Sequence, residues 1–178
     1  LTAFSFCAIG FVHGDNSDLL KAAESNDTNT VNAMLLDGAD VSVTQTDGAT
    51  ALHWAAYWNE IDLAAKLLEA GSEINAKNEL GVAPLSIACR NGSLAMVTTL
   101  LAQGADPLTE EPSGETALMT CARTGSAGAV IQLLAGGANP NALETNSGQS
   151  ALMWAASGGH TSAVRALIEA GANTNAQS

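Results

Sequence analysis

Residues 151–156 read ALMWAA and residues 51–56 read ALHWAA, so one six-residue phrase occurs twice, 100 positions apart. A leucine in the same setting recurs through the chain at Leu19, Leu52, Leu85, Leu118 and Leu152, in steps of 33, 33, 33 and 34 residues. A glycine series keeps the same steps at Gly38, Gly71, Gly104, Gly137 and Gly171. A fixed period of this length predicts a stack of repeated units rather than a single irregular domain.

One unit, residues 47–78, shows what each repeat builds. Gly48 follows a Thr-Asp pair in a tight-turn sequence, and Thr50 stands at the N-cap of a helix. Small apolar residues then recur at helical spacing up to Asn59, a residue type that tolerates the left-handed conformation and so ends the helix. A second apolar helix follows and ends at Gly71. The unit is predicted to be a turn followed by two helices.

The cap of the first helix carries a family resemblance. Thr50-Ala51-Leu52-His53 keeps three of the four letters of the motif T-P-L-H, and 33 residues is the length of the ankyrin repeat, which the chain resembles over residues 15–178. The resemblance implies an all-α ankyrin-repeat solenoid of five stacked helix-turn-helix units with β-hairpin loops. We expect the five units at residues 15–46, 47–78, 79–110, 111–144 and 145–178.

Residues 1–14 do not belong to the repeats. The stretch holds all three Phe residues of the chain and no Asp, Glu, Lys or Arg, and it runs into Gly14 just before polar residues begin. This pattern is typical of the apolar core and cleavage region of a signal peptide, here without its basic start. We therefore expect a truncated signal peptide at residues 1–14 and a periplasmic or secreted protein. The alternatives are a hydrophobic segment that caps the solenoid, and a cytoplasmic protein.

Composition limits the partners. The formal net charge is −12, with 18 acidic and 6 basic side chains, so a nucleic-acid backbone would be repelled. Nothing after residue 14 is apolar for long enough to span a bilayer, so we expect no membrane contact in the mature form. We expect a monomer.

No residue pattern indicates chemistry. The family resemblance implies that His53 ties neighbouring turns together, and His160 stands at the start of a second helix. Cys89 and Cys121 fall at small-residue positions of first helices, and we interpret both as buried hydrophobic side chains; a disulfide between them is the less favoured alternative. We expect no catalytic, cofactor or metal site.

A candidate binding surface emerges when equivalent positions are compared. Two positions after the small residues of each first helix form a series that we call the ladder: Glu24-Ser25, Tyr57-Trp58, Arg90-Asn91, Arg123-Thr124 and Ser157-Gly158. Stacked units place these pairs in a row, so an aromatic pair stands beside two arginines. Tyr, Trp and Arg are enriched in binding hot spots.

We therefore predict that a partner binds through Tyr57, Trp58, Arg90, Asn91, Arg123 and Thr124, and that the turn tips orient it through Asp47, Glu79 and Glu115, with Gln149 in the last unit. The alternative is that the arginines only offset nearby carboxylates and that Trp58 lies flat on a neighbouring unit. Proteins that the chain resembles dock partners on the concave surface made by hairpin tips and first helices. This implies a non-catalytic protein-interaction module, with a targeting segment of a longer enzyme as the alternative.

Overall fold

The computed structural model describes residues 16–176, and in this range the chain forms ten short α-helices. The predicted signal peptide at residues 1–14 lies outside the described residues. The helices are α1 (Asn16–Glu24), α2 (Thr28–Leu36), α3 (Ala51–Trp58), α4 (Ile61–Glu69), α5 (Pro84–Arg90), α6 (Leu94–Ala102), α7 (Ala117–Arg123), α8 (Ala127–Ala135), α9 (Ala151–Ser157) and α10 (Thr161–Glu169).

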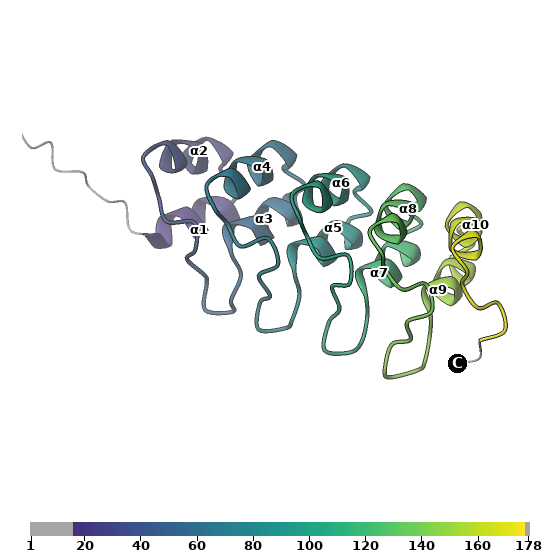
Figure 1. The fold of residues 1–178 in the computed structure, drawn as a ribbon. Helices are drawn as coiled ribbons and strands as arrows, with labels where there is room; N and C mark the ends of the chain where they lie inside the picture. Colours follow the sequence, from purple (N-terminus) through teal and green to yellow (C-terminus); the bar gives the residue numbers. More distant parts are fainter. Residues whose placement is uncertain (1–15, 177–178) are drawn as a thin grey trace, which may run out of the picture.

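The helices form two rows, as Figure 1 shows. The odd-numbered helices lie side by side in one row, the even-numbered helices form the second row, and the loops between pairs project beyond the first row. Within each pair the two helices pack together, and each helix also packs on its equivalent in the next pair. The predicted all-α solenoid is confirmed.

The caps explain where the first helices begin. The hydroxyl of Thr50 accepts a hydrogen bond from the backbone N–H of His53, and Thr116 and Ser150 cap α7 and α9 in the same way. Before α5 the equivalent residue is Ala83, which makes no side-chain cap, and Pro84 occupies the first turn instead. Proline suits that turn because its fixed φ is helical and its missing N–H has no partner to lose there.

The ends of the first helices also follow the sequence. Asn59 has φ 60°, one of two non-glycine residues with positive φ in the described chain, and Gly92, Gly125 and Gly159 take the same conformation at the equivalent positions. Asparagine tolerates this region better than other side chains, because its short polar group bonds locally. The left-handed residue turns the chain sharply into the second helix.

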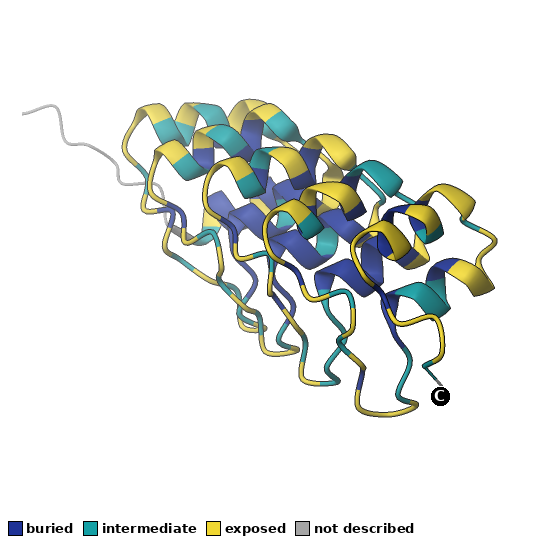
Figure 2. Ribbon diagram, turned by 45° about the vertical axis from the view of Figure 1, so that its right-hand side comes forward, coloured by how far each residue is buried: buried dark blue, intermediate teal, exposed yellow. Residues whose placement is uncertain are grey.

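One continuous core runs between the two rows. Leu52, Leu85 and Leu118 are buried at equivalent positions of successive first helices, and Leu100 and Leu133 meet them from second helices. Figure 2 shows the buried residues where the rows face each other, with the loop tips and outer faces exposed. Because each fully buried leucine contributes roughly 1.5–3 kcal/mol, the repeated leucines supply much of the stability.

The predicted β-hairpins are shorter than full hairpins. In the described part of the chain no strand forms, and the loops contain two isolated antiparallel bridges, Glu110 with Thr116 and Leu143 with Ser150. Neighbouring loop tips are also joined directly, since the Glu79 N–H donates to the Asp47 carbonyl at 2.8 Å. Within residues 16–176, no helix combines the length and apolar character needed to cross a bilayer.

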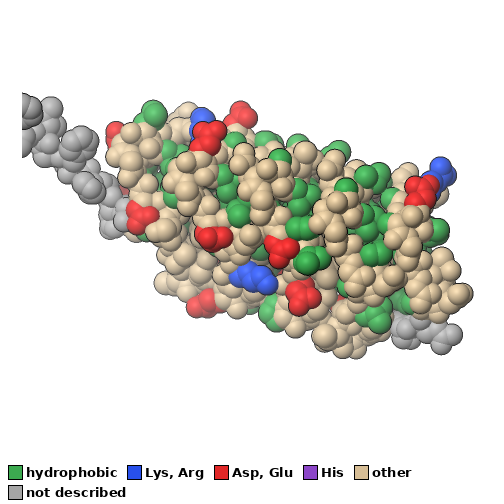
Figure 3. All heavy atoms as spheres, viewed as in Figure 1, with side chains coloured by type: hydrophobic (Ala, Val, Ile, Leu, Met, Phe, Trp, Pro, Cys, Tyr) green, Lys and Arg blue, Asp and Glu red, His purple; other side chains and the backbone are tan. Residues whose placement is uncertain are grey.

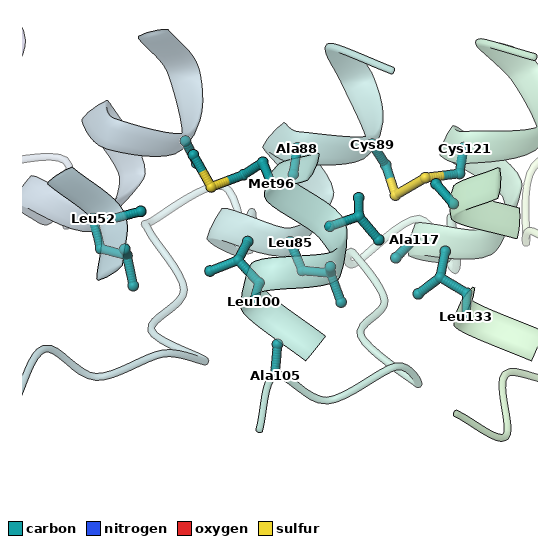
Figure 4. Close-up of a cluster of buried hydrophobic side chains, with 14 of the residues drawn as sticks. Leu52, Leu85, Ala88, Cys89, Met96, Leu100, Ala105, Ala117, Cys121 and Leu133 are labelled. Carbon is teal, nitrogen blue, oxygen red and sulfur yellow. A yellow bond between two sulfur atoms is a disulfide. The ribbon is translucent and has the colours of Figure 1, made fainter. Parts of the chain in front are cut away.

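The interpretation of the two cysteines was right about burial and wrong about pairing. Cys89 and Cys121 are fully buried, and they form a disulfide that joins α5 to α7, with their Cα atoms 4.5 Å apart (Figure 4). They lie 32 residues apart, one less than the repeat, so they are not equivalent positions. Because α5 and α7 pack side by side, the last small residue of one helix faces the preceding position of the next. The repeat alignment alone did not show this cross-helix contact.

Candidate functional site

The ladder lies at the ends of the first helices, as predicted, but its two columns differ. We call Glu24, Tyr57, Arg90, Arg123 and Ser157 the first column, and Ser25, Trp58, Asn91, Thr124 and Gly158 the second column. Each first-column residue stands at or next to the last residue of its helix, and each second-column residue directly follows it.

The second column ties three of the repeats to the one before. Trp58 Nε1 donates to the Glu24 carbonyl at 3.1 Å, and Asn91 Nδ2 donates to the Tyr57 carbonyl at 2.9 Å. Thr124 Oγ1 donates in the same way to the Cys89 carbonyl at 3.1 Å. These bonds satisfy carbonyl groups that a helix end leaves without an intrahelical partner. Three of the predicted partner-binding residues therefore have a structural role, which the sequence did not reveal.

The aromatic residues of the ladder form an exposed cluster with a third ring. Tyr57 is 53% exposed and Trp58 is 42% exposed. Their ring centroids lie 4.9 Å apart at an interplanar angle of 81°, and Trp54 lies 5.7 Å from Tyr57 at the same angle. Edge-to-face contacts of this kind hold rings in fixed orientations. The cluster is thus a rigid apolar patch within a strongly acidic protein.

Both arginines of the first column form ion pairs within the molecule. Arg90 Nη2 lies 2.5 Å from Glu111 Oε1, and Arg123 Nη2 lies 3.1 Å from Glu115 Oε1. Burial raises the pKa of Glu111 above its usual value, and the guanidinium of Arg90 offsets part of that rise. The arginines therefore do offset carboxylates, as the alternative interpretation held. The arginine side chains nevertheless stay about half exposed, at 41% for Arg90 and 51% for Arg123.

Arg123 makes a further contact, with the last repeat. Its guanidinium carbon lies 5.1 Å from the ring centroid of Trp154, within the range of a cation–π interaction. A shallow depression of about 340 Å³ adjoins the pair and is also lined by Gln149 and Ser157. Trp54 and Trp154 both pack partly against the core.

Of the three acidic residues predicted at the turn tips, only two are exposed. Asp47 and Glu79 lie exposed on neighbouring loop tips. Glu115 instead turns inward, where its side chain is 18% exposed and also accepts a hydrogen bond from Thr120 Oγ1 at 2.8 Å. Its carboxylate is therefore used within the molecule, because the short loop places it beside Arg123. Figure 3 shows further carboxylates spread over several repeats on one face, with few basic side chains among them.

Sequence reasoning missed a buried carboxylate in the last loop. Glu144 accepts hydrogen bonds from the Ser147 hydroxyl and from the backbone N–H groups of Asn146, at 2.7 Å, and Gln149, at 3.1 Å. These bonds, that of Ser147 foremost, lower the pKa of Glu144 to about 2. This loop is one residue longer than the loops of the other repeats, and Glu144 forms a local network of hydrogen bonds within it.

The histidines have the structural roles that the sequence suggested. His53 Nδ1 accepts from the Thr50 N–H at 3.1 Å, and Nε2 lies 3.0 Å from the Val82 carbonyl of the next unit. His160 Nε2 lies 3.0 Å from the Arg123 carbonyl. Across residues 16–176, no group of three or more His, Cys, Asp or Glu side chains is arranged to hold a metal ion.

Comparison with protein families finds a match to the model described as "Ankyrin repeats (3 copies)", over residues 19–111 and again over residues 85–178. The two matches overlap and together cover the chain from residue 19 to its last residue. Comparison with curated proteins finds no match.

Proposed function

Because this chain belongs to the ankyrin-repeat family, we propose that it is a non-catalytic module that binds a partner protein on the concave surface formed by its loop tips and first helices. Ankyrin repeats are generally protein–protein interaction modules and typically perform no catalysis. The observation that carries the proposal is the exposed pair Tyr57 and Trp58 at the end of α3, which packs edge to face with the half-buried Trp54. The positions equivalent to Tyr57 and Trp58 in the other repeats hold charged, polar or smaller residues, so packing of the repeat does not require these two rings.

The arginines extend this surface along the first column. Arg90 and Arg123 remain half exposed although each has a carboxylate partner. Their carboxylate partners are largely buried, so each guanidinium can keep its ion pair and offer its exposed part to a second partner. Trp58, Asn91 and Thr124 hold the first-column residues in register, and Asp47 and Glu79 add negative charge at the edge.

A site-specific cross-linking experiment tests the surface. A photoreactive phenylalanine analogue at Tyr57 is expected to capture a protein from an extract of the source cells. The same analogue at Ile131, equally exposed at 54% but on α8 of the second row, is the matched control and should not capture it. Equal capture at both positions, or capture at Ile131 only, contradicts the proposal.

The captured partner then permits a quantitative test. We expect Trp58→Ala and Arg90→Ala each to weaken binding by more than about 1 kcal/mol, as truncation of hot-spot residues does. Since Arg90→Ala leaves Glu111 without its cation, Glu111→Gln controls for loss of the ion pair alone. Since Trp58→Ala removes the bond to the Glu24 carbonyl, the unfolding free energy of each variant must be measured as well. Normal binding by both variants, or loss only through unfolding, rules out the ladder.

We also propose that the protein is exported. The Cys89–Cys121 disulfide supports this, because disulfides persist in oxidising compartments and are rare in the cytosol. When the complete gene is expressed in a bacterium, mass spectrometry of the mature product should show an N-terminus near Gly14. A cytoplasmic product that retains residues 1–14 would reject export.

A further inference from the structure

Trp54 and Trp154 occupy the same position in their repeats, 100 residues apart, and each donates its indole N–H to a glutamine of the preceding loop. Trp54 Nε1 lies 3.1 Å from Gln45 Oε1, and Trp154 Nε1 lies 2.5 Å from Gln149 Oε1. The two rings are therefore held in a similar way. What differs is the residue that the preceding repeat supplies next to each ring.

At Trp154 the preceding repeat supplies a cation. Arg123, the last residue of α7, places its guanidinium 5.1 Å from the ring centroid, and Glu115 binds the same guanidinium at 3.1 Å. Ring, guanidinium and carboxylate form a complete set within the molecule. Such a set combines cation–π attraction with a charge-assisted hydrogen bond.

At Trp54 the equivalent residue is an acid. Glu24, the last residue of α1, stands at the first-column position of Arg123, three repeats of 33 residues earlier. Glu24 Oε2 accepts a hydrogen bond at 2.9 Å from Nε2 of Gln45, the same glutamine that binds Trp54. A carboxylate has about four acceptor positions, so this bond leaves others for a further donor. The ring and the carboxylate are thus present at this end, and the preceding repeat brings no guanidinium to them.

We propose that Trp54, Tyr57 and Glu24 form a site for an arginine side chain of a partner protein, which supplies the guanidinium that Arg123 supplies at Trp154. The inference rests on the proposed function and adds the chemistry of the partner: a basic segment. Tyr57 contributes a second, exposed ring 5.7 Å from Trp54. Arginine fits better than lysine because its planar group stacks on rings and binds carboxylates through a fixed fork of donors.

The surroundings favour a cationic segment. Glu24 and Asp47 line a depression of about 550 Å³ beside Gln45. Lys21 also lines it, but its ammonium group lies 3.1 Å from Asp18 on the same helix. The whole chain carries a net charge of −12, which attracts a basic segment over a longer range.

The test uses a synthetic peptide, Gly-Ser-Arg-Gly-Ser-Arg-Gly-Ser, with a second peptide in which citrulline replaces both arginines. Citrulline keeps the shape of arginine and removes its charge. Titration calorimetry is expected to show binding of the arginine peptide to the wild-type protein, weakened about tenfold by Glu24→Gln and by Tyr57→Ala, the scale of a cation–π or charged contact. The citrulline peptide should bind the wild-type protein at least as weakly as the arginine peptide binds these two variants. Glu69→Gln, which removes the same charge from the exposed end of α4, should leave the dissociation constant unchanged.

Glu24→Arg tests the internal comparison directly. The variant should place its own guanidinium beside Trp54, as Arg123 does beside Trp154, and so block the arginine peptide without lowering the free energy of unfolding. Failure of the wild type to bind the peptide, equal binding of the citrulline peptide, or equal effects of Glu24→Gln and Glu69→Gln would overturn the inference. A partner captured at Tyr57 in the cross-linking experiment would still support the proposed function in each of these cases, so the two failures can be told apart.

Discussion

His53 shows how one side chain can join two repeats. The equivalent positions hold Ser86, Met119 and Met153, so the imidazole is a feature of one unit. It is buried, it accepts from the Thr50 N–H, and this leaves Nε2–H to donate to the Val82 carbonyl of the next unit. The bond from the Thr50 N–H requires the neutral ring, since a protonated imidazole has no acceptor.

The burial of His53 predicts a pH dependence of stability. Burial lowers the pKa of His53, and the bond to Val82 and the charge of Asp47 oppose this only in part. In the unfolded chain the pKa is about 6.5, so the unfolded state takes up the proton first as the pH falls. The stabilisation is therefore complete above that value and is lost as the pH falls from there through the lower pKa of the folded protein.

Denaturant unfolding at pH 7.5 and pH 5.5 measures this effect. The wild type is expected to lose more unfolding free energy between the two conditions than His53→Gln, which does not titrate. Parallel losses in the two proteins would show that His53 does not carry the dependence.

At the scale of elements, the joints between first helices decide how the units stack. The first three joints each carry a side-chain bond from the second column, the joint between α7 and α9 carries the contact of His160 with the Arg123 carbonyl instead, and the joint between α5 and α7 is also covalent. Thr124 bonds to the Cys89 carbonyl, so the covalent and hydrogen-bonded links of this joint meet at the same residue. The centre of the solenoid is therefore its most constrained part.

Removal of the disulfide should destabilise the protein without changing its fold. For a closed loop of this length, with a sequence separation of 32 residues, the chain-entropy argument gives about 3–4 kcal/mol. We expect Cys89→Ala with Cys121→Ala to lose an amount of this order in denaturant unfolding, while the helical circular dichroism signal stays the same. Alanine suits both positions because it occupies the neighbouring buried positions Ala88 and Ala122.

A reductant distinguishes the bond from simple packing. Dithiothreitol should lower the stability of the wild type and leave the double variant unchanged. Alkylation of Cys89 or Cys121 in the unreduced, denatured wild type would mean that no disulfide had formed.

At the scale of the whole molecule, the stability of each repeat depends on the repeats beside it. In a solenoid each unit contacts only the units beside it, so folding depends on the interfaces between units as well as on the units themselves. The core here is one cluster that runs from α1 to α10 without a gap. A change in the central unit should therefore affect both halves.

Leu85→Asp places a charge in that central unit. Leu85 is 1% exposed, and an unpaired buried charge costs several kcal/mol or more, so we expect cooperative unfolding to be lost. Leu36→Asp is the matched control, because Leu36 is 89% exposed at the end of α2, and it should unfold like the wild type. A Leu85→Asp protein with the wild-type denaturation midpoint would contradict the repeat alignment.

The sequence by itself determined the period, the helix pairs, the cap at Thr50 and the series of equivalent leucines. These features depend on local patterns that recur along the chain: a hydroxyl caps several of the first helices, a left-handed residue follows each of them, and apolar residues return at helical spacing. The positions of the ladder residues at the ends of the first helices followed from the same alignment, because equivalent residues must stack.

Only the tertiary structure decided what these residues contact. The Cys89–Cys121 bond, the inward turn of Glu115, the ion pair of Arg90 with Glu111 and the contact of Arg123 with Trp154 all join residues of different elements. Period and propensity specify which positions are equivalent, but not how far one helix is shifted or rotated against the next. That relation depends on side-chain packing across the interface. A shift of one residue between α5 and α7 decides whether Cys89 and Cys121 remain two buried thiols or form a disulfide.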